Sequence, residues 1–248
     1  MRLLKEILGR IFALWAMVWF VATMFIVLIP IWVIGLWPEP GRTIYLCKIL
    51  RTWMKFFFFI TALRMRIKGK EYFNTGETFI VVCNHNTLMD IPVSTPAIQG
   101  PSKTIAKVEM SRIPLFGMIY KRGSVLVDRK NEESRKASYG KMKNVLELGI
   151  HMCIYPEGTR NKTKSPLQRF HDGAFKLAVD TSHSILPAVI FNTNKIMPNN
   201  KTFYLWPGKI EMHFLSPIDP SSLTVEQLKE KTFTTMKEHY LNRTSKNY

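Results

Sequence analysis

Acidic residues are scarce in this sequence: its 248 residues include 18 Asp and Glu against 35 Lys and Arg, a formal net charge of +17. Cysteine is also sparse, because only Cys47, Cys83 and Cys153 occur, each in an apolar context and without metal-ligand spacing. This odd count argues against a disulfide framework or a metal site and predicts reduced, buried packing residues. No helix-turn-helix, zinc-finger or RNA-binding aromatic pattern accompanies the positive charge, so nucleic acid is not an expected partner.

The positive charge is concentrated near an apolar segment. Residues 1–70 hold eleven Lys and Arg but only two acidic residues, and they include the most apolar part of the chain. Positive charge around an apolar run favours an anionic bilayer surface as partner. Residues 11–37 form an uncharged run of 27 residues, interrupted only by Pro30 and Gly35. A spanning helix needs about 20 residues, and the run is too long for a cleavable signal, so we expect a retained membrane anchor.

The geometry of this anchor has more than one interpretation. Basic residues flank the run on both sides, which places both ends in the cytosol under the positive-inside rule. This pattern favours a hairpin bent near Pro30, or a helix lying partly in one leaflet, and a single-pass anchor is the alternative. Residues 43–65 continue as a second apolar helix with Lys48, Arg51 and Lys55 on one face. We expect this face at the membrane interface; the alternative is a helix packed on the soluble domain with these side chains in solvent.

The remainder of the chain alternates apolar runs with amphipathic helical stretches, which is typical of an α/β domain with a largely buried sheet. A short strand is expected at residues 64–68, where basic and apolar residues alternate. A crossover helix is expected at residues 131–148 and a terminal helix at residues 225–240. The further candidate strands are residues 79–83, 103–107, 124–127, 151–155, 185–191 and 210–214.

Residues 84–90 carry the most direct chemical signal. His85 follows an apolar run, so it leaves the sheet at the carboxyl end of a strand, where open α/β sheets place their sites. Asp90 is placed to open the next helix and to turn back toward the imidazole. A carboxylate on one ring nitrogen fixes the tautomer and stabilises the imidazolium, which equips His85 as a general base. The alternative is a capping aspartate beside an unrelated histidine.

Cations lie at three further strand ends. Arg129 closes the strand that begins after Gly123, Arg160 follows another strand, and Lys107 ends a third. The fork of arginine matches phosphate oxygens and lysine supplies a point charge, so neighbouring strand ends of this kind predict a phosphate site. Taken singly, each of these side chains is an ordinary solvated or salt-bridged surface residue.

These segments form an ordered set of motifs, N-H-x4-D, K-x-E-M, G-x-V-L-V-D-R, Y-P-E-G-T-R and I-L-P-A-V. The set resembles the glycerolipid acyltransferase family, and most closely its PlsC-like lysophosphatidic acid acyltransferases, over roughly residues 79–189. The resemblance implies an αβα acyltransferase domain with a mixed, largely buried sheet at residues 69–248, preceded by membrane-associated helices at residues 1–68. It also implies transfer of a fatty acyl group from a thioester to lysophosphatidic acid, which yields phosphatidic acid for phospholipid biosynthesis.

The resemblance assigns roles residue by residue. His85 corresponds to the family's base and Asp90 to the residue that orients it. Pro187 matches a motif associated with acyl-donor binding or with shaping the site. Tyr155 and Leu126 stand where the family often has Phe, which concerns the surroundings of the acyl chain. The residues that match motifs for binding the glycerol phosphate are Lys107, Gly123, Arg129, Glu157, Gly158, Thr159 and Arg160.

The expected mechanism is direct transfer in a ternary complex, with acyl-CoA or an acyl-carrier protein as donor and with no bound cofactor or metal. His85 removes the proton of the acceptor hydroxyl as that oxygen attacks the thioester. Cys83 is the rival nucleophile, but it lies inside a predicted strand and is expected to point to the opposite face from Asn84.

Two competing functions remain. One is an acyltransferase with another acceptor, such as glycerol 3-phosphate, a lysophospholipid or a lipoamino acid, and the other is a non-catalytic membrane protein that binds anionic lipid. The protein is expected at a membrane, and the bacterial inner membrane is the expected one. The catalytic domain is expected on the cytosolic face, because acyl carriers are soluble in the cytosol. The glycosylation sequon Asn161-Lys162-Thr163 is expected to be unused, because a glycan there would obstruct the acceptor.

Overall fold

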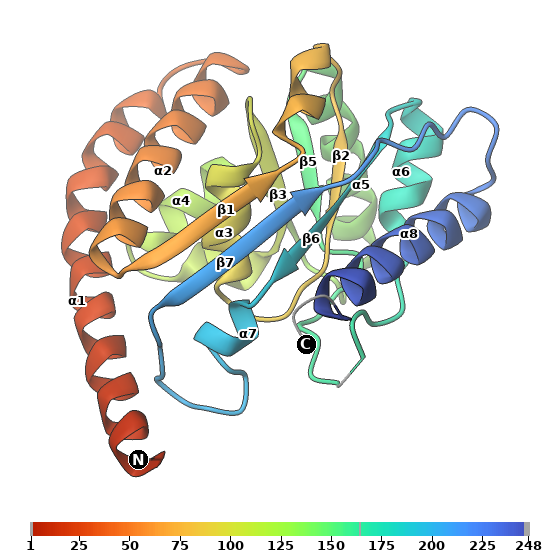
Figure 1. Ribbon diagram of the computed structural model, residues 1–248. Helices are drawn as coiled ribbons and strands as arrows, with labels where there is room; N and C mark the ends of the chain where they lie inside the picture. Colours follow the sequence, from red (N-terminus) through yellow and green to blue (C-terminus); the bar gives the residue numbers. More distant parts are fainter. Residues whose placement is uncertain (1, 164, 246–248) are drawn as a thin grey trace.

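The computed structural model describes residues 2–163 and 165–245. Its centre is a seven-stranded sheet in the order β1-β7-β6-β2-β5-β3-β4 (Figure 1). The five strands from β6 to β4 are parallel, whereas β7 runs antiparallel to β6 and β1 runs parallel to β7. The predicted mixed sheet is therefore confirmed. The strands are β1 (Leu63–Lys68), β2 (Ile80–Cys83), β3 (Ser102–Lys107), β4 (Ser124–Val127), β5 (His151–Ile154), β6 (Ile185–Phe191) and β7 (Gly208–Phe214).

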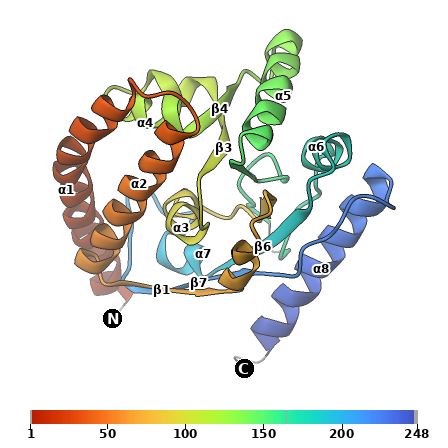
Figure 2. The same cartoon turned by 90° about the horizontal axis from the view of Figure 1, so that it is seen from above.

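Helices cover both faces of the sheet (Figure 2). One layer contains α1 to α4, and the opposite layer contains α5, α6 and α8. The α-helices are α1 (Arg2–Ile34), α2 (Gly41–Ile60), α3 (Asp90–Ala97), α4 (Phe116–Gly123), α5 (Glu132–Glu147), α6 (Gly173–Thr181), α7 (Thr193–Ile196) and α8 (Val225–Ser245), and the short 3-10 helices are η1 (Lys70–Thr75) and η2 (Val108–Arg112).

The central strands contribute to two apolar cores. In β6, Leu186 and Ala188 face the layer of α1 to α4, whereas Ile185 and Val189 face the opposite layer. All seven residues of β6 are buried, because parallel strands covered on both faces need apolar side chains at every position. This burial explains why the apolar runs of the sequence located the central strands.

The first strand extends the sheet into the N-terminal part of the chain. β1 pairs with β7 along its whole length, from Leu63 opposite Gly208 to Lys68 opposite His213. The sheet therefore begins at Leu63, five residues before the predicted end of the N-terminal segment. A functional boundary between residues 68 and 69 stays a prediction.

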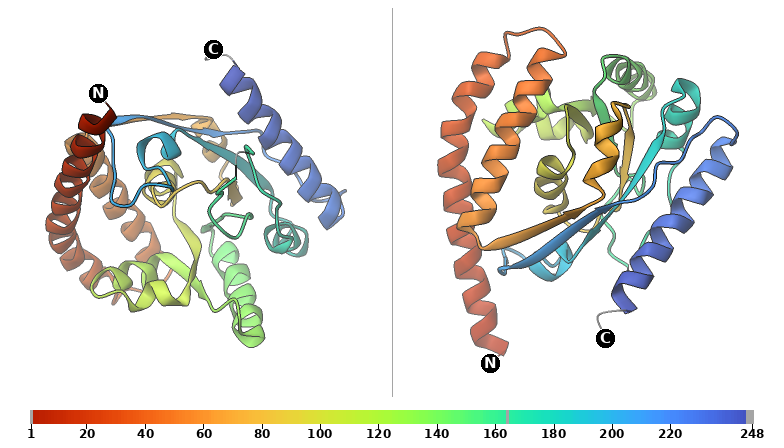
Figure 3. Two further views of the ribbon diagram at one scale, coloured as in Figure 1. Left: turned by 90° about the horizontal axis from the view of Figure 1, so that it is seen from below. Right: turned by 45° about the horizontal axis from the view of Figure 1, so that its top comes forward.

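The predicted bend at Pro30 is wrong. α1 is one continuous helix through Pro30, and its hydrogen bonds continue beyond the proline, where Gly35 N–H donates to the carbonyl of Ile31 at 3.2 Å. The chain turns at residues 35–40 instead, and α2 returns antiparallel beside α1 (Figure 3). Glu39 holds this turn, because its carboxylate accepts hydrogen bonds from Arg42 and Thr43 and from Lys103 of β3. Although burial acts to raise the pKa of Glu39, these donors lower it to about 2.

α1 is the one helix of the described chain that is long and apolar enough to cross a membrane, over Leu3–Ile34, and 28% of its most apolar window is buried. Large apolar side chains are exposed along its outer face, including Ile26 and Trp32. The helix α2 does not present the expected row of three free cations, since the guanidinium of Arg51 donates to the carbonyl oxygens of Ile98 and Gly100. For Arg51 the alternative interpretation, a helix packed on the domain, is therefore correct.

Candidate active site

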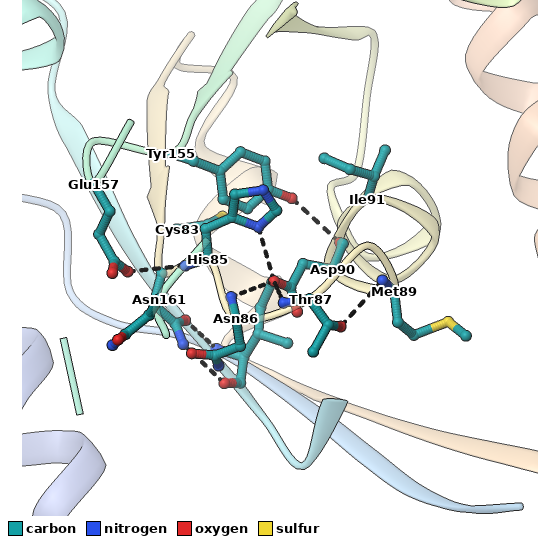
Figure 4. A network of polar contacts seen from close by, with 12 residues as sticks. Cys83, His85, Asn86, Thr87, Met89, Asp90, Ile91, Tyr155, Glu157 and Asn161 are labelled. Atoms are coloured by element: carbon teal, nitrogen blue, oxygen red, sulfur yellow. Dashed lines mark hydrogen bonds and ion pairs between the residues drawn. The ribbon is translucent and has the colours of Figure 1, made fainter. Parts of the chain in front are cut away.

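The site centres on a histidine and an aspartate that lie on either side of a tight loop (Figure 4). His85 follows the end of β2, and Asp90 is the first residue of α3. His85 Nδ1 lies 2.9 Å from Asp90 Oδ2, and the same oxygen accepts the backbone N–H groups of Asn86 at 2.5 Å and Thr87 at 2.8 Å. Asp90 is fully buried at a helix N-terminus, where the helix dipole favours negative charge. With Nδ1 donating to the carboxylate, Nε2 is left as the proton acceptor.

The backbone of His85 is held by the loop that follows β5. His85 N–H donates to Glu157 Oε1 at 2.9 Å, and His85 O accepts from Asn161 N–H at 2.6 Å. The other oxygen of Glu157 accepts from Gln168 N–H at 3.1 Å. Burial raises the pKa of Glu157 to about 7, although both amide hydrogen bonds act to lower it. In the structure Glu157 therefore contacts amides of the protein, and its geometry supports positioning of His85 rather than contact with an acceptor.

Two residues that the sequence did not assign to the site also fix this loop. The ring of Tyr155 packs against the imidazole of His85 with centroids 4.5 Å apart, and its hydroxyl donates to Ser94 Oγ at 2.9 Å. Asn84 is buried and exchanges two hydrogen bonds with the backbone of Ile190 in β6, at 2.7 and 3.0 Å. Their sequence signals were weak: Asn84 directly precedes the histidine, and Tyr155 stands where the family often has Phe.

Cys83 does not share this environment. It is buried in β2 with its Sγ 4.0 Å from Sγ of Cys153, and both thiols are free. The hydrogen bond with Cys153 and burial together raise the pKa of Cys83 well above its usual range. A thiol that stays protonated is a poor nucleophile, so the geometry disfavours Cys83 as the attacking group.

The predicted cations lie at the same edge of the sheet as His85. Lys107 ends β3, Arg129 follows β4 and Arg160 lies in the loop after β5. Arg129 donates to the carbonyl of Gly158, and Gly158 has φ of +70°, a conformation that favours glycine. Lys107 and Arg160 are exposed, and neither pairs with a carboxylate within residues 2–163 and 165–245. Thr159, which directly precedes Arg160, is also exposed.

Two predicted site residues lie elsewhere. Gly123 immediately precedes β4, so it is at the opposite end of that strand from Arg129, and it lines an apolar cavity. Gly123 is therefore not beside the cations at the carboxyl end of β4, and its contact with a phosphate stays a prediction. Pro187 is buried in the middle of β6, opposite Val82 of β2. By strand alternation it faces the layer of α6 and α8, away from α3. Its predicted role in acyl-donor binding or in shaping the site stays a prediction.

An apolar cavity of about 480 Å³ adjoins the histidine loop. Leu88 and Met89 of that loop form part of its wall, and an aromatic group of Phe20, Trp53 and Phe57 lies in the α1–α2 pair. The remaining lining comes from further residues of α1 and α2, from α3, α4 and the segment 197–205, and from single residues of β3, η2 and β4. The sequence did not predict this cavity, because its walls come from segments almost two hundred residues apart.

The arrangement joins three chemical capacities at one edge of an α/β sheet: proton removal, attraction of an anion, and accommodation of a long apolar group. A substrate with an apolar chain and an anionic head would complement this arrangement. The Acyltransferase family model matches residues 64–191, about half of the chain, and the chain belongs to this family.

Curated proteins and a solved structure are similar to this chain. The 1-acyl-sn-glycerol-3-phosphate acyltransferase of Cocos nucifera is 32% identical over 65% of this chain and 52% of its own length. The enzyme of that name from Escherichia coli is 30% identical over 61% of each chain, and the mouse alpha form is 25% identical over 76% of this chain and 66% of its own length. The matched region therefore spans between about half and two thirds of these relatives. The crystal structure of the LPA acyltransferase PlsC from Thermotoga maritima has a TM-score of 0.80 and 24% identity, with 98% of each chain covered.

Proposed function

We propose that this protein transfers a fatty acyl group from an acyl thioester to the free hydroxyl of lysophosphatidic acid, which yields phosphatidic acid. The observation that carries the proposal is the His85–Asp90 pair, 2.9 Å apart, between exposed cations and an apolar cavity. An acceptor with a phosphate at one end and an acyl chain at the other has both features that these surroundings complement. The names of the curated relatives give the same acceptor and support the proposal.

In the proposed reaction, His85 Nε2 takes the proton of the acceptor hydroxyl as its oxygen attacks the thioester carbonyl. The tetrahedral intermediate collapses with cleavage of the carbon–sulfur bond, and the imidazolium returns the proton to the departing thiolate. Asp90 stabilises the imidazolium between these two steps through its hydrogen bond to Nδ1. The balance requires no covalent enzyme intermediate and no cofactor.

The acceptor phosphate is proposed to bind Arg129, Arg160 and Lys107, since charge-assisted bonds from arginine are strong and geometrically specific. An acyl chain is proposed to occupy the 480 Å³ cavity beside Leu88 and Met89. The donor is acyl-CoA or an acyl-carrier protein. With α1 in contact with a bilayer, the domain is proposed to face the cytosol, where these carriers are soluble.

The test is a turnover assay with purified full-length protein. Lysophosphatidic acid, glycerol 3-phosphate and a lysophospholipid with a headgroup are each offered with acyl-CoA and with an acyl-carrier protein. We expect turnover with lysophosphatidic acid to exceed turnover with the other acceptors and to disappear in His85→Ala. His183→Ala is the matched control, because His183 lies before the amino end of β6, at the opposite edge of the sheet from His85. Equal rates for wild type and His85→Ala would contradict the proposal.

A further inference from the structure

A second hollow, distinct from the apolar cavity that adjoins the histidine loop, lies in the seam between α1 and α2. Its volume is about 420 Å³, and it is more open than the cavity. Trp53 lines both spaces, and its indole N–H donates to Thr23 Oγ1 at 2.8 Å in a buried contact, so this side chain forms a wall between them. We call the outer hollow the seam groove; its lining residues are Thr23, Ile26, Val27, Lys48, Ile49, Thr52, Trp53 and Phe56.

The seam groove opens on an apolar surface. Ile26 and Phe56 at its border are 69% and 48% exposed, and Phe59, one turn further along α2, is 84% exposed. Large apolar side chains continue along α1, where Trp32 is 58% exposed. A contiguous apolar surface of this kind on a helical pair marks contact with a membrane or a partner.

Lys48 supplies a charge at the border of this groove. Its ammonium lies 5.0 Å from the ring centroid of Tyr45, and no carboxylate of the described chain pairs with it. Tyr45 in turn packs edge-to-face on Trp37 with centroids 5.0 Å apart. Tryptophan, tyrosine and lysine together are typical of the headgroup level of a bilayer, where aromatic rings and snorkelling lysines reside.

We propose that the seam groove binds one acyl chain of an anionic phospholipid of the bilayer, with the lipid phosphate on Lys48. The apolar walls suit a chain, the exposed surface around them suits a leaflet, and an unpaired ammonium at the border suits an anionic headgroup. A protein segment would need to satisfy its own backbone polar groups in these apolar surroundings, whereas a lipid chain has none. Arg51 is not available for this contact because it is bonded to Ile98 and Gly100.

Lys55 offers a matched control. It is an exposed lysine on the same helix, two turns after Lys48, but it does not line the groove. The experiment uses full-length protein in mild detergent, offered phosphatidylglycerol or phosphatidylcholine with identical chains, and counts the lipids retained per protein by native mass spectrometry. The variants are Lys48→Gln, Lys55→Gln and Thr52→Trp, which fills the groove from an exposed position.

For the wild type and for Lys55→Gln we expect one lipid retained in the seam groove, in addition to any lipid held in the cavity beside the histidine loop. This lipid should show about a fivefold preference for phosphatidylglycerol, the ratio that one charge near an anionic group gives. Lys48→Gln should lose the preference for phosphatidylglycerol but still retain a lipid in the groove. Thr52→Trp should retain one lipid fewer than the wild type. None of the three changed residues lines the apolar cavity beside the histidine loop, so a lipid there should be unaffected and acyl transfer in detergent should persist in all variants. Equal loss of preference in Lys55→Gln, or an unchanged lipid count in Thr52→Trp, would overturn the assignment. Failure of the proposed acyl transfer is a separate result.

Discussion

The pairing of His85 with Asp90 predicts a specific non-additive result. Asp90→Asn keeps the shape of the side chain but removes the charge that faces His85 Nδ1 at 2.9 Å. A hydrogen bond to a charged group contributes about 1.5–3 kcal/mol. If that stabilisation acts on the imidazolium of the transition state, kcat should fall by about 10- to 150-fold. Loss of the base itself in His85→Ala should cost about 10²- to 10⁴-fold.

The double variant His85→Ala/Asp90→Asn decides between two roles for the aspartate. If Asp90 acts on turnover only through the imidazole, the double variant should be no slower than His85→Ala alone. The assay is steady-state transfer of a radiolabelled acyl group, with the melting temperature of each variant measured alongside. If the fold-loss of kcat in the double variant equals the product of the losses in the two single variants, with melting temperatures unchanged, the reasoning is refuted and Asp90 has an independent role.

Three further predictions follow from the surroundings of this pair. Arg160→Ala should raise KM for the acceptor by about tenfold with kcat nearly unchanged, because a phosphate contact stabilises the ground state and the transition state equally. Steady-state kinetics will check this, with Lys162→Ala as the control, and a loss confined to kcat would contradict it. Cys83→Ala should retain turnover, and a trapped acyl-enzyme in the wild type that is absent from this variant would speak against direct transfer. The pKa of Glu157, about 7 when folded against 4.5 as the ordinary value, implies that the folded chain holds an extra proton between these pH values. The free energy of unfolding should therefore fall by up to about 3 kcal/mol as pH rises from 4.5 to 7, and denaturant titrations should show a flatter dependence in Glu157→Gln.

The parts of the fold that the sequence predicted are those in which local pattern and burial coincide. β6 matches its predicted span, because both of its faces are covered and every position is apolar. The crossover helix also matches closely, since Asn131 accepts from Ser134 N–H at 2.9 Å and caps the first turn of α5. The prediction of a bend at Pro30 was wrong because a proline near the end of a helix removes one hydrogen bond without forcing a turn. The turn lies further along the chain, where Glu39 fixes it through Lys103, a residue 64 positions away.

The candidate site also has a part that the sequence predicted and a part that it did not. The approach of Asp90 to His85 could be predicted because the two residues are five positions apart and the helix start determines their geometry. The sequence motifs did not predict which of their side chains are exposed and which are buried. Glu157 and Arg160 are three residues apart, yet Glu157 is buried against two amides whereas Arg160 is exposed. Gly123 and Arg129 belong to one motif, yet they lie at opposite ends of β4.

The N-terminal helices α1 and α2 belong both to the fold and to the surroundings of the candidate site. The groups that carry out the proposed chemistry lie between residues 84 and 160, but the cavity beside them is lined in part by Phe20 of α1 and by Trp53 and Phe57 of α2. The outer faces of the same two helices are apolar and exposed. Under the proposed function, this one pair of helices contacts the bilayer on its outer side and bounds the space for an acyl chain on its inner side. In that arrangement, a chain that leaves the leaflet would follow the apolar side chains exposed along α1 and α2, which reduces the cost of exposing it to water.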